Sequence, residues 1–264
     1  MDLGIRDRVA MVAAASKGIG YAVAAALAEE GCRVSICARG GQELEAARAR
    51  LETIGGNGRV FAQVADVSRS GDIDRWHAAT VAALGAVDIL VTNTGGPPAA
   101  LFTALTDEQW EAGFQSTLMN VVRLSRLVIP DMQRRHWGRI IHLTSLVAKH
   151  PADDLTISTT LRTGLSALTR TQSNQLARSG ILVNAVLPGN TLTERARHLA
   201  AVRATARGIT PDEALDHVAQ SVPVGRLADP AEIGAAVAFL ASERASYITG
   251  VSLLVDGGVA QCPI

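Results

Sequence analysis

Two residue types that often supply acid–base chemistry are nearly missing from this chain. Among its 264 residues there are only two tyrosines, Tyr21 and Tyr247, and only two lysines, Lys17 and Lys149. Arginine supplies nearly all of the positive charge instead. A reaction that uses a phenol or an ammonium group is therefore restricted to these four positions.

An excess of charge and long apolar runs are also absent. The 25 basic and 25 acidic residues give a formal net charge of zero, and no basic block or acidic tail suggests nucleic acid. The apolar runs are too short and too interrupted to span a bilayer. The charged start of the chain, residues 1–8, lacks the apolar core of a signal peptide. We therefore expect a cytoplasmic protein without nucleic-acid or membrane partners.

Cysteine is scarce and shows no pairing pattern. Cys32, Cys37 and Cys262 form no Cys-x-x-Cys motif, which excludes a disulfide framework and predicts small core or tail residues. We expect no metal site.

The chain does contain a regular alternation of short apolar runs with amphipathic stretches. Strand-like runs lie at 9–15, 34–37, 60–64, 87–92, 140–144, 181–186 and 253–255. Helix-like stretches lie at 21–30, 42–54, 73–84, 107–135, 156–178 and 231–240. This alternation predicts α/β architecture, a seven-stranded parallel sheet with helices on both faces. No linker or repeat interrupts it, so we treat residues 1–264 as a single domain.

Three helix starts are marked by side chains that cap them. Thr106 with Gln109 and Thr210 with Glu213 have capping-box spacing, and Asp229 is followed by a proline in the first helical turn.

The first strand leads at once into a turn of small residues, Ala13-Ala14-Ala15-Ser16-Lys17-Gly18-Ile19-Gly20, and then into a helix. This order places a helix N-terminus, with its free N–H groups and positive dipole end, under a bound phosphate. Lys17 adds a positive charge. The alternative is an ordinary strand-to-helix turn with glycines for packing.

The turn resembles the T-G-x-x-x-G-I-G motif of short-chain dehydrogenases/reductases, with alanine at its first two positions. An alanine at the first glycine position carries a steric penalty if its φ is positive. The resemblance, which runs from about residue 8 to 258, implies a doubly wound Rossmann-type fold. It also implies a dinucleotide contacted by Ala14, Ser16, Lys17, Gly18, Ile19 and Gly20.

The ends of the next strands extend the expected cofactor site. Arg39 follows the second strand where an acidic residue would favour NAD, and with Lys17 it indicates the 2′-phosphate of NADP(H); the alternative is a solvated Arg39. The resemblance implies that Asp66 and Val67 contact the adenine, although Asp66 also suits a helix N-cap. It likewise implies cofactor contacts from Asn93, Gly95, Pro188, Gly189, Thr191 and Thr193, and a substrate lid over 190–222.

The catalytic half departs from the family pattern. The resemblance assigns Asn120 to a proton relay, unless a neighbouring helix satisfies it, and Ser145 to the substrate carbonyl. The family's tyrosine and lysine positions hold Ser158 and Arg162. Arg162 can still bind ribose hydroxyls, but it stays protonated. Ser158 has a hydroxyl far less acidic than a phenol.

Other groups near this stretch offer a substitute donor. Lys149 follows Ser145 by four residues on the loop that lines the family's cleft, although a solvated loop lysine is the more ordinary interpretation. His142, inside the strand, is expected to be a satisfied core histidine.

Three functions stay open at this point. One is an NADP(H)-dependent oxidoreductase, similar to 3-oxoacyl-carrier-protein reductases, that acts on a small carbonyl or alcohol with an altered proton donor. The second is a reductase-like scaffold that binds NADP(H) or a partner chain without turnover. The third is a non-redox lyase or isomerase. By resemblance, the long stretches 107–135 and 156–178 imply a homotetramer or homodimer.

Overall fold

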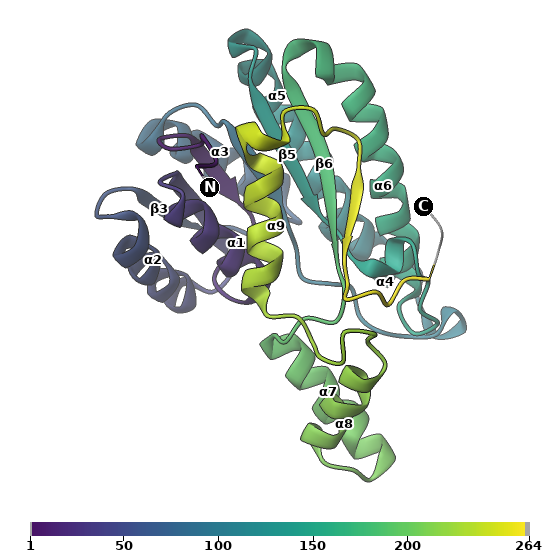
Figure 1. The fold of residues 1–264 in the computed structure, drawn as a ribbon. Helices are drawn as coiled ribbons and strands as arrows, with labels where there is room; N and C mark the ends of the chain where they lie inside the picture. Colours follow the sequence, from purple (N-terminus) through teal and green to yellow (C-terminus); the bar gives the residue numbers. More distant parts are fainter. Residues whose placement is uncertain (1, 262–264) are drawn as a thin grey trace.

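Seven parallel strands form the centre of the structure (Figure 1). A computed structural model describes residues 2–261, without the side chains of Arg203 and Ala206. The strands are β1 (Val9–Val12), β2 (Arg33–Ala38), β3 (Val60–Val64), β4 (Ile89–Thr92), β5 (Gly138–Leu143), β6 (Ile181–Pro188) and β7 (Ser252–Val255). Their order across the sheet is β3-β2-β1-β4-β5-β6-β7. The predicted seven-stranded, doubly wound sheet is confirmed.

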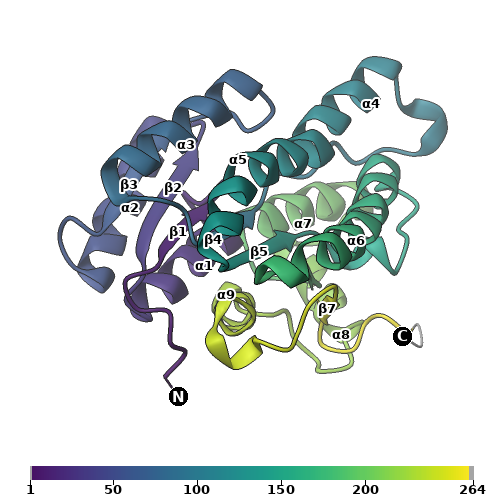
Figure 2. The same cartoon turned by 90° about the horizontal axis from the view of Figure 1, so that it is seen from above.

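Helices cover both faces of this sheet, as the view from above shows (Figure 2). One layer contains α1 (Gly18–Glu29), α2 (Gly41–Gly55) and α9 (Pro230–Ala241). The other contains α3 (Ser70–Leu84), α5 (Asn120–Arg135) and α6 (Thr156–Leu176). Because β1 is covered on both sides, all four of its residues are buried, which explains why its sequence is apolar throughout instead of alternating.

The winding direction changes between β1 and β4, which lie side by side in the sheet. In open α/β sheets, ligands bind in the crevice outside the carboxyl ends of the strands at such a switch point. The turn after β1 and the loop after β4 therefore lie where a ligand is expected.

The predicted single helix over 107–135 is wrong in one respect. The structure divides it into α4 (Asp107–Gly113), a π-helical segment η2 (Phe114–Met119) and α5. The capping box of Thr106 and Gln109 is confirmed at the start of α4. A wider π turn is rare and often marks a functional site. Hydrophobic periodicity cannot reveal such a turn, because the apolar stripe continues through it.

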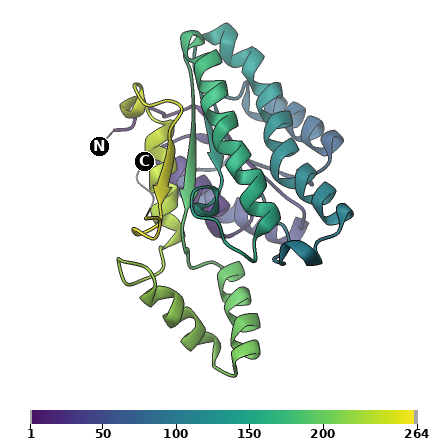
Figure 3. The ribbon, with the colours of Figure 1, turned by 90° about the vertical axis from the view of Figure 1, so that its right-hand side faces the viewer.

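Residues 194–222 are more ordered than the sequence indicates. They form α7 (Glu194–Arg207) and α8 (Pro211–Gln220), a hairpin that projects below the carboxyl edge of the sheet (Figures 1 and 3). The capping box at Thr210 is confirmed. The hairpin is held together by a small apolar cluster, chiefly Ala200, Ala204 and Ala214. The helix α7 was missed because alanines and arginines give it no apolar stripe.

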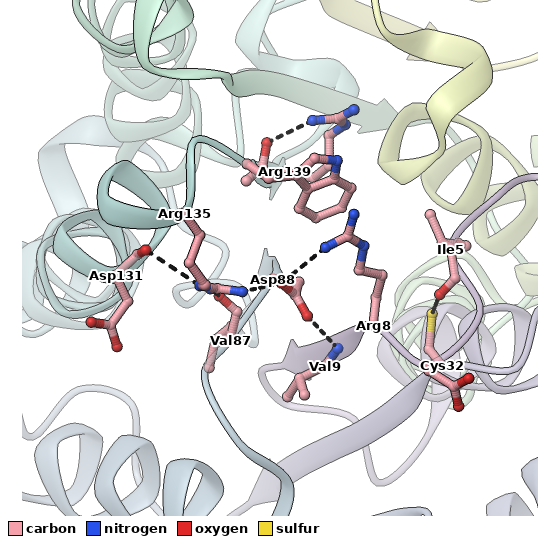
Figure 4. Close-up of polar contacts among 12 residues, drawn as sticks. Ile5, Arg8, Val9, Cys32, Val87, Asp88, Asp131, Arg135 and Arg139 are labelled. Carbon is pink, nitrogen blue, oxygen red and sulfur yellow. Dashed lines mark hydrogen bonds and ion pairs between the residues drawn. The ribbon is translucent and has the colours of Figure 1, made fainter.

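A charged cluster fastens the opposite, amino-terminal edge of the sheet (Figure 4). Asp88 is 5% exposed, and its carboxylate accepts hydrogen bonds from the Val9 N–H at 2.9 Å and from the guanidinium groups of Arg8 and Arg135. Arg8 also stacks 3.7 Å from the ring centre of Trp137. Three segments distant in sequence are thereby joined to one carboxylate.

The two described cysteines lie in the core, as expected. Cys32 and Cys37 are fully buried, and burial raises the pKa of each thiol to about 12. Cys262 lies outside the described residues. Among residues 2–261, no helix is both long and apolar enough to cross a membrane.

Candidate active site

Backbone hydrogen bonds hold the turn after β1 against both neighbouring strands. The N–H of Ala13 donates to the carbonyl of Val91 at 3.1 Å, and that of Ala15 donates to Cys37 at 2.9 Å. Between them Ala14 has a φ of 49°, the left-handed conformation that usually requires glycine. The sequence-based expectation of a steric penalty at this position is therefore confirmed.

Gly20 packs directly beneath this turn. A Cβ at Gly20 would lie 2.3 Å from the carbonyl oxygen of Ala14 and 2.8 Å from Nδ2 of Asn93. That Nδ2 already donates to the Ala14 carbonyl at 3.2 Å. Asn93, expected to contact the cofactor, thus also fixes the shape of the turn from the end of β4.

These contacts predict a large effect for one substitution in the turn and a small effect for another. Gly20→Ala should weaken nucleotide binding at least about 10-fold, because its methyl group pushes the turn away from α1. Ala14→Gly should change the free energy of unfolding by less than about 1 kcal/mol, since relief of strain is offset by added freedom in the unfolded chain. Nucleotide titration and urea unfolding measure the two effects. A normal nucleotide affinity in Gly20→Ala would contradict this account of the turn.

The first turn of α1 presents free backbone donors to the crevice. Lys17 occupies the N-cap position in extended conformation, and no side chain caps the helix there. Gly18 has a φ of 59°, while Ser16 is buried and Ile19 packs on the core. The first N–H groups of a helix have no partner within it, so this end of α1 fits a phosphate group.

The side chain of Lys17 is already engaged by two carboxylates. Its Nζ lies 2.7 Å from Glu194 and 3.4 Å from Glu43, and all three side chains are more than half exposed. The hydrogen bond to Glu194, then that to Glu43, raises the pKa of Lys17. Glu43 opens α2 and Glu194 opens α7, and the sequence analysis overlooked both. Exposed ion pairs are weak in water, so a phosphate can replace these partners.

Arg39 differs from Lys17 in having an unengaged guanidinium group. It is exposed just after β2, and no hydrogen bond or ion pair joins it to another described residue. Its charge nevertheless reaches Asp66 after β3. Two basic residues, Lys17 and Arg39, therefore lie close to the start of α2.

Asp66 forms a local turn and does not cap α3. Its Oδ1 accepts hydrogen bonds from the N–H and the hydroxyl of Ser68 at 2.9 and 2.7 Å, whereas the N-cap of α3 is Arg69. Burial alone would raise the pKa of Asp66, but the Ser68 hydrogen bonds and the nearby arginines lower it. The Val67 side chain lies in the core, so only its backbone is available to a ligand.

The remaining predicted cofactor contacts lie in the loops after β4 and β6. Gly95 has open space where a side chain would be. The Gly189 N–H, after Pro188, is held by the carbonyl of Val255 at 2.9 Å. Thr191 is buried and pairs with Ala228. The Thr193 hydroxyl caps α7 by accepting the Ala196 N–H, and its methyl group would touch a side chain at Gly18.

The end of β5 and the start of α6 bring the predicted catalytic groups together. Ser145 is half-buried and lies two residues after the end of β5, where it caps a short 3₁₀ turn and its Oγ accepts the Val147 N–H at 3.4 Å. Ser158 and Arg162 stand one turn apart on α6, and Arg162 Nε donates to Ser158 Oγ at 3.1 Å. Arg162 Nη1 donates to the carbonyls of Thr144 at 2.6 Å and Leu143 at 3.4 Å. Arg162 thus connects Ser158 to the backbone beside Ser145.

Arg162 is a deeply buried cation. It is 6% exposed, and burial, followed by the charge of Arg195, lowers its pKa to about 10. At neutral pH the guanidinium remains charged. It therefore supplies a fixed positive charge next to the Ser158 hydroxyl.

Comparison with known proteins identifies the family. Residues 13–260 match the family model described as enoyl-(acyl carrier protein) reductase. The chain is 34% identical to the 3-oxoacyl-[acyl-carrier-protein] reductase FabG of Vibrio cholerae over 257 residues, which is 97% of this chain and 99% of that protein. The chain belongs to the short-chain dehydrogenase/reductase family.

Solved structures of this family match the whole fold. The L-sorbose reductase of Gluconobacter frateurii, in complex with NADPH and L-sorbose, superposes with a TM-score of 0.95 at 31% identity, covering 100% of both chains. A short-chain oxidoreductase of Pseudomonas aeruginosa PAO1, described as containing an atypical catalytic center, has a TM-score of 0.90 at 30% identity, with 98% and 100% covered.

Both tyrosines of the chain lie away from Ser158. Tyr21 is on α1, where Arg50 stacks 4.3 Å from its ring centre. Tyr247 precedes β7 and is fully exposed. A cavity of about 810 Å³ also lies away from Ser158; it runs along α1 and α9 and includes Gly18 and Thr193 at one end. Neither phenol of this short-chain dehydrogenase/reductase family member faces the Ser158–Arg162 pair.

The segment η2 adds a residue that the sequence analysis missed. Thr117 is 1% exposed, and its hydroxyl has no partner among the described residues. Asn120 is fully buried; its Oδ1 accepts the Val121 N–H, while its Nδ2 is likewise unpartnered within residues 2–261. Gly113 packs on Ile157 and Leu161 of α6, and Leu118 reaches Gly164. The segment that carries Thr117 and leads to Asn120 therefore packs against α6, the helix of Ser158 and Arg162.

The other acid–base candidates differ in their surroundings. Lys149 ends the 3₁₀ turn after Ser145 and is half-buried. His142 is fully buried between Thr92, 2.9 Å from Nδ1, and Gln172, 2.8 Å from Nε2. Burial lowers the pKa of His142 to about 4, so it is neutral at pH 7. This is the satisfied core histidine expected from the sequence. Within the described part of the chain, no cluster of three or more His, Cys, Asp or Glu side chains could hold a metal ion.

Proposed function

We propose that this chain is an NADP(H)-dependent oxidoreductase that acts on a small carbonyl or alcohol with an altered proton donor. The observation that carries the proposal is that the first N–H groups of α1 and the hydrogen-bonded Ser158–Arg162 pair beside Ser145 both lie at the carboxyl ends of the central strands. The NADPH complex of the similar L-sorbose reductase supports the choice of cofactor.

The residues of the crevice fit a dinucleotide phosphate. The first turn of α1 would hold the diphosphate through its N–H groups, and Arg39 would meet the 2′-phosphate. Asn93 and Gly20 keep the turn close to α1, so the donors are in place before a ligand arrives. When bound, the nicotinamide supplies or accepts the hydride.

The side chains at β5 and α6 would handle the substrate oxygen. The Ser145 hydroxyl is placed to donate to a carbonyl oxygen. Ser158 accepts a hydrogen bond from the charged Arg162, which leaves its own proton free to point into the crevice. Because a serine hydroxyl is far less acidic than a phenol, proton donation from it is slow. We therefore expect weak activity on simple ketones.

The proton relay to which the resemblance assigns Asn120 would extend to Thr117. Both are buried polar side chains with an unpartnered atom, and buried water commonly fills such positions. A water held between them would lie on the segment that packs against α6.

A second candidate function is a scaffold that binds NADP(H) without ordinary turnover. The observation that favours it is the position of Tyr21 and Tyr247, both away from Ser158. Such a scaffold would bind the dinucleotide normally but reduce no carbonyl compound in its presence.

Cofactor preference provides the first test. We expect NADPH to bind more tightly than NADH, and Arg39→Gln to reduce NADPH affinity about 10- to 100-fold while leaving NADH unchanged, because it removes a charge-assisted phosphate contact. Fluorescence titration measures both affinities. Arg69→Gln, an equal loss of charge on a neighbouring exposed arginine, is the matched control. Equal affinities for the two dinucleotides would refute the role of Arg39.

A further inference from the structure

Arg162 is a buried charge without an opposite charge. Its hydrogen bonds go to Ser158 and to two backbone carbonyls, all of them neutral acceptors. No carboxylate of the described residues lies within ion-pair distance, and none is near enough to affect its pKa. Burying an ion without a counter-ion costs several kcal/mol. An anionic ligand in the crevice would offset part of that cost.

A second arginine reaches the same crevice from the lid. Arg195, in the first turn of α7, donates to the carbonyls of Gly96 at 3.1 Å and Pro97 at 3.3 Å. These carbonyls follow β4, which pairs with β5, the strand whose end receives Arg162. Arg195 is close enough to act electrostatically on Arg162. The two guanidinium groups therefore both lie at the carboxyl ends of the neighbouring strands β4 and β5.

The acidic residue next to Arg195 does not neutralise this pair. Glu194 directs its carboxylate to Lys17 at 2.7 Å, on the turn after β1. The described ion pairs include none with Arg195, whose hydrogen bonds likewise go to neutral carbonyl oxygens. Two like charges near each other raise the free energy of the ligand-free protein. This arrangement is stabilised when an anion lies between them.

We infer that the substrate of this site carries a free carboxylate, held between Arg162 and Arg195, so that the substrate class is a small oxo acid or hydroxy acid. The inference rests on the proposed oxidoreductase function and narrows its substrate class. Guanidinium groups bind carboxylates through paired N–H donors. A phosphate of the cofactor could supply the same negative charge to the two arginines. The experiment therefore has to distinguish a substrate carboxylate from a cofactor phosphate.

The test compares oxo acids with their neutral methyl esters. Calorimetry measures the binding of 2-oxobutanoate, 3-oxobutanoate, 4-oxopentanoate and their methyl esters to the protein saturated with NADP⁺, which has no hydride to deliver. At least one acid should bind about 10-fold or more tightly than its ester. Arg195→Gln should abolish this preference, and Arg195→Lys should retain part of it. Arg197→Gln, a nearby exposed arginine on the same helix, is the matched control and should retain all of it.

Arg162 needs a milder change because it is buried. Arg162→Lys keeps a positive charge but loses the fork of donors, so we expect a smaller acid-over-ester preference, compared at saturating NADP⁺ because Arg162 is also placed to bind the cofactor's ribose hydroxyls. Its folding is checked by thermal unfolding before the titrations. Arg195 is exposed, so its substitutions should not disturb folding, and they provide the main test.

The outcomes separate this inference from the proposed function. Equal binding of every acid and its ester, or no binding by all three acids, overturns it. A loss of NADP⁺ affinity in Arg195→Gln with the acid preference retained also overturns it, and assigns Arg195 to a cofactor phosphate. Reduction of neutral ketones without acid preference supports the oxidoreductase function and contradicts only the inference that the substrate carries a carboxylate. Tight binding of acids without any reduction supports the carboxylate inference and contradicts the oxidoreductase function.

Discussion

Replacing Ser158 with tyrosine and Arg162 with lysine is expected to raise kcat/KM for a simple ketone by about 100- to 10,000-fold. The two positions are one helical turn apart and already joined by a 3.1 Å hydrogen bond. A phenol at 158 beside an ammonium at 162 would provide a positioned acid that the native pair lacks. Steady-state oxidation of NADPH, with a cyclic ketone and a β-ketoester as substrates, measures the change.

Two control variants separate acid catalysis from changes in shape. Ser158→Phe with Arg162→Lys fills the same volume without a hydroxyl, and it should show no gain. Arg162→Lys alone changes the cation only, and we expect activity within about 10-fold of the native chain. A gain in the phenylalanine variant would show that packing, and not proton donation, limits the native chain.

A native chain that already reduces ketones at ordinary enzyme rates would contradict the missing-acid account. In that case another group supplies the proton, and Lys149 is the first candidate because it ends the turn that Ser145 begins. Loss of activity in Lys149→Ala, with NADPH affinity unchanged, would identify it as that group.

Asp88→Ala is expected to lower the free energy of unfolding by about 2–4 kcal/mol. The substitution removes the carboxylate that joins Arg8, Arg135 and the Val9 N–H. It leaves a buried backbone donor and two partly buried guanidinium groups without that acceptor. Urea unfolding, followed by tryptophan fluorescence, gives the value from the midpoint and slope.

Glu243→Gln is the matched control for Asp88. Glu243 belongs to the same charged edge, where it pairs with Arg139 at 3.4 Å, but its side chain is 44% exposed. Because glutamine keeps an oxygen that can accept from the 4% exposed Arg139, this replacement should cost less than the loss of Asp88. Because these residues lie at the amino-terminal edge of the sheet and the cofactor is expected at its carboxyl edge, NADPH affinity should not change in either variant. An equal loss of unfolding free energy in both variants would show that the burial of Asp88 does not make its loss more costly than that of Glu243.

Much of the framework was predictable because it depends on local patterns. Buried parallel strands read as short apolar runs, and threonine or aspartate followed three residues later by glutamate or glutamine marks a helix start, as at Thr210. The turn between β1 and α1 was recognisable from its small residues. At Ala14 the sequence predicts a steric cost if φ is positive, and the structure has a φ of 49° there.

The missed features depend on contacts between distant residues. The engagement of Lys17 by Glu43 and Glu194 joins three separate elements, and no local spacing relates them. The π turn at Thr117 reflects packing of η2 on α6. The approach of Arg195 to Arg162 depends on where the start of α7 meets the loop after β4. In each case the residue type was visible, but its partner was not.

The contact between Lys17 and Glu194 has a thermodynamic consequence. One residue belongs to the turn below the crevice and the other to the first turn of the projecting hairpin. A phosphate that takes Lys17 must displace Glu194, which weakens the attachment of the hairpin at that point. By reciprocity, whatever fastens the hairpin through this pair lowers nucleotide affinity by the same factor. Nucleotide binding and detachment of the hairpin from Lys17 are therefore thermodynamically coupled.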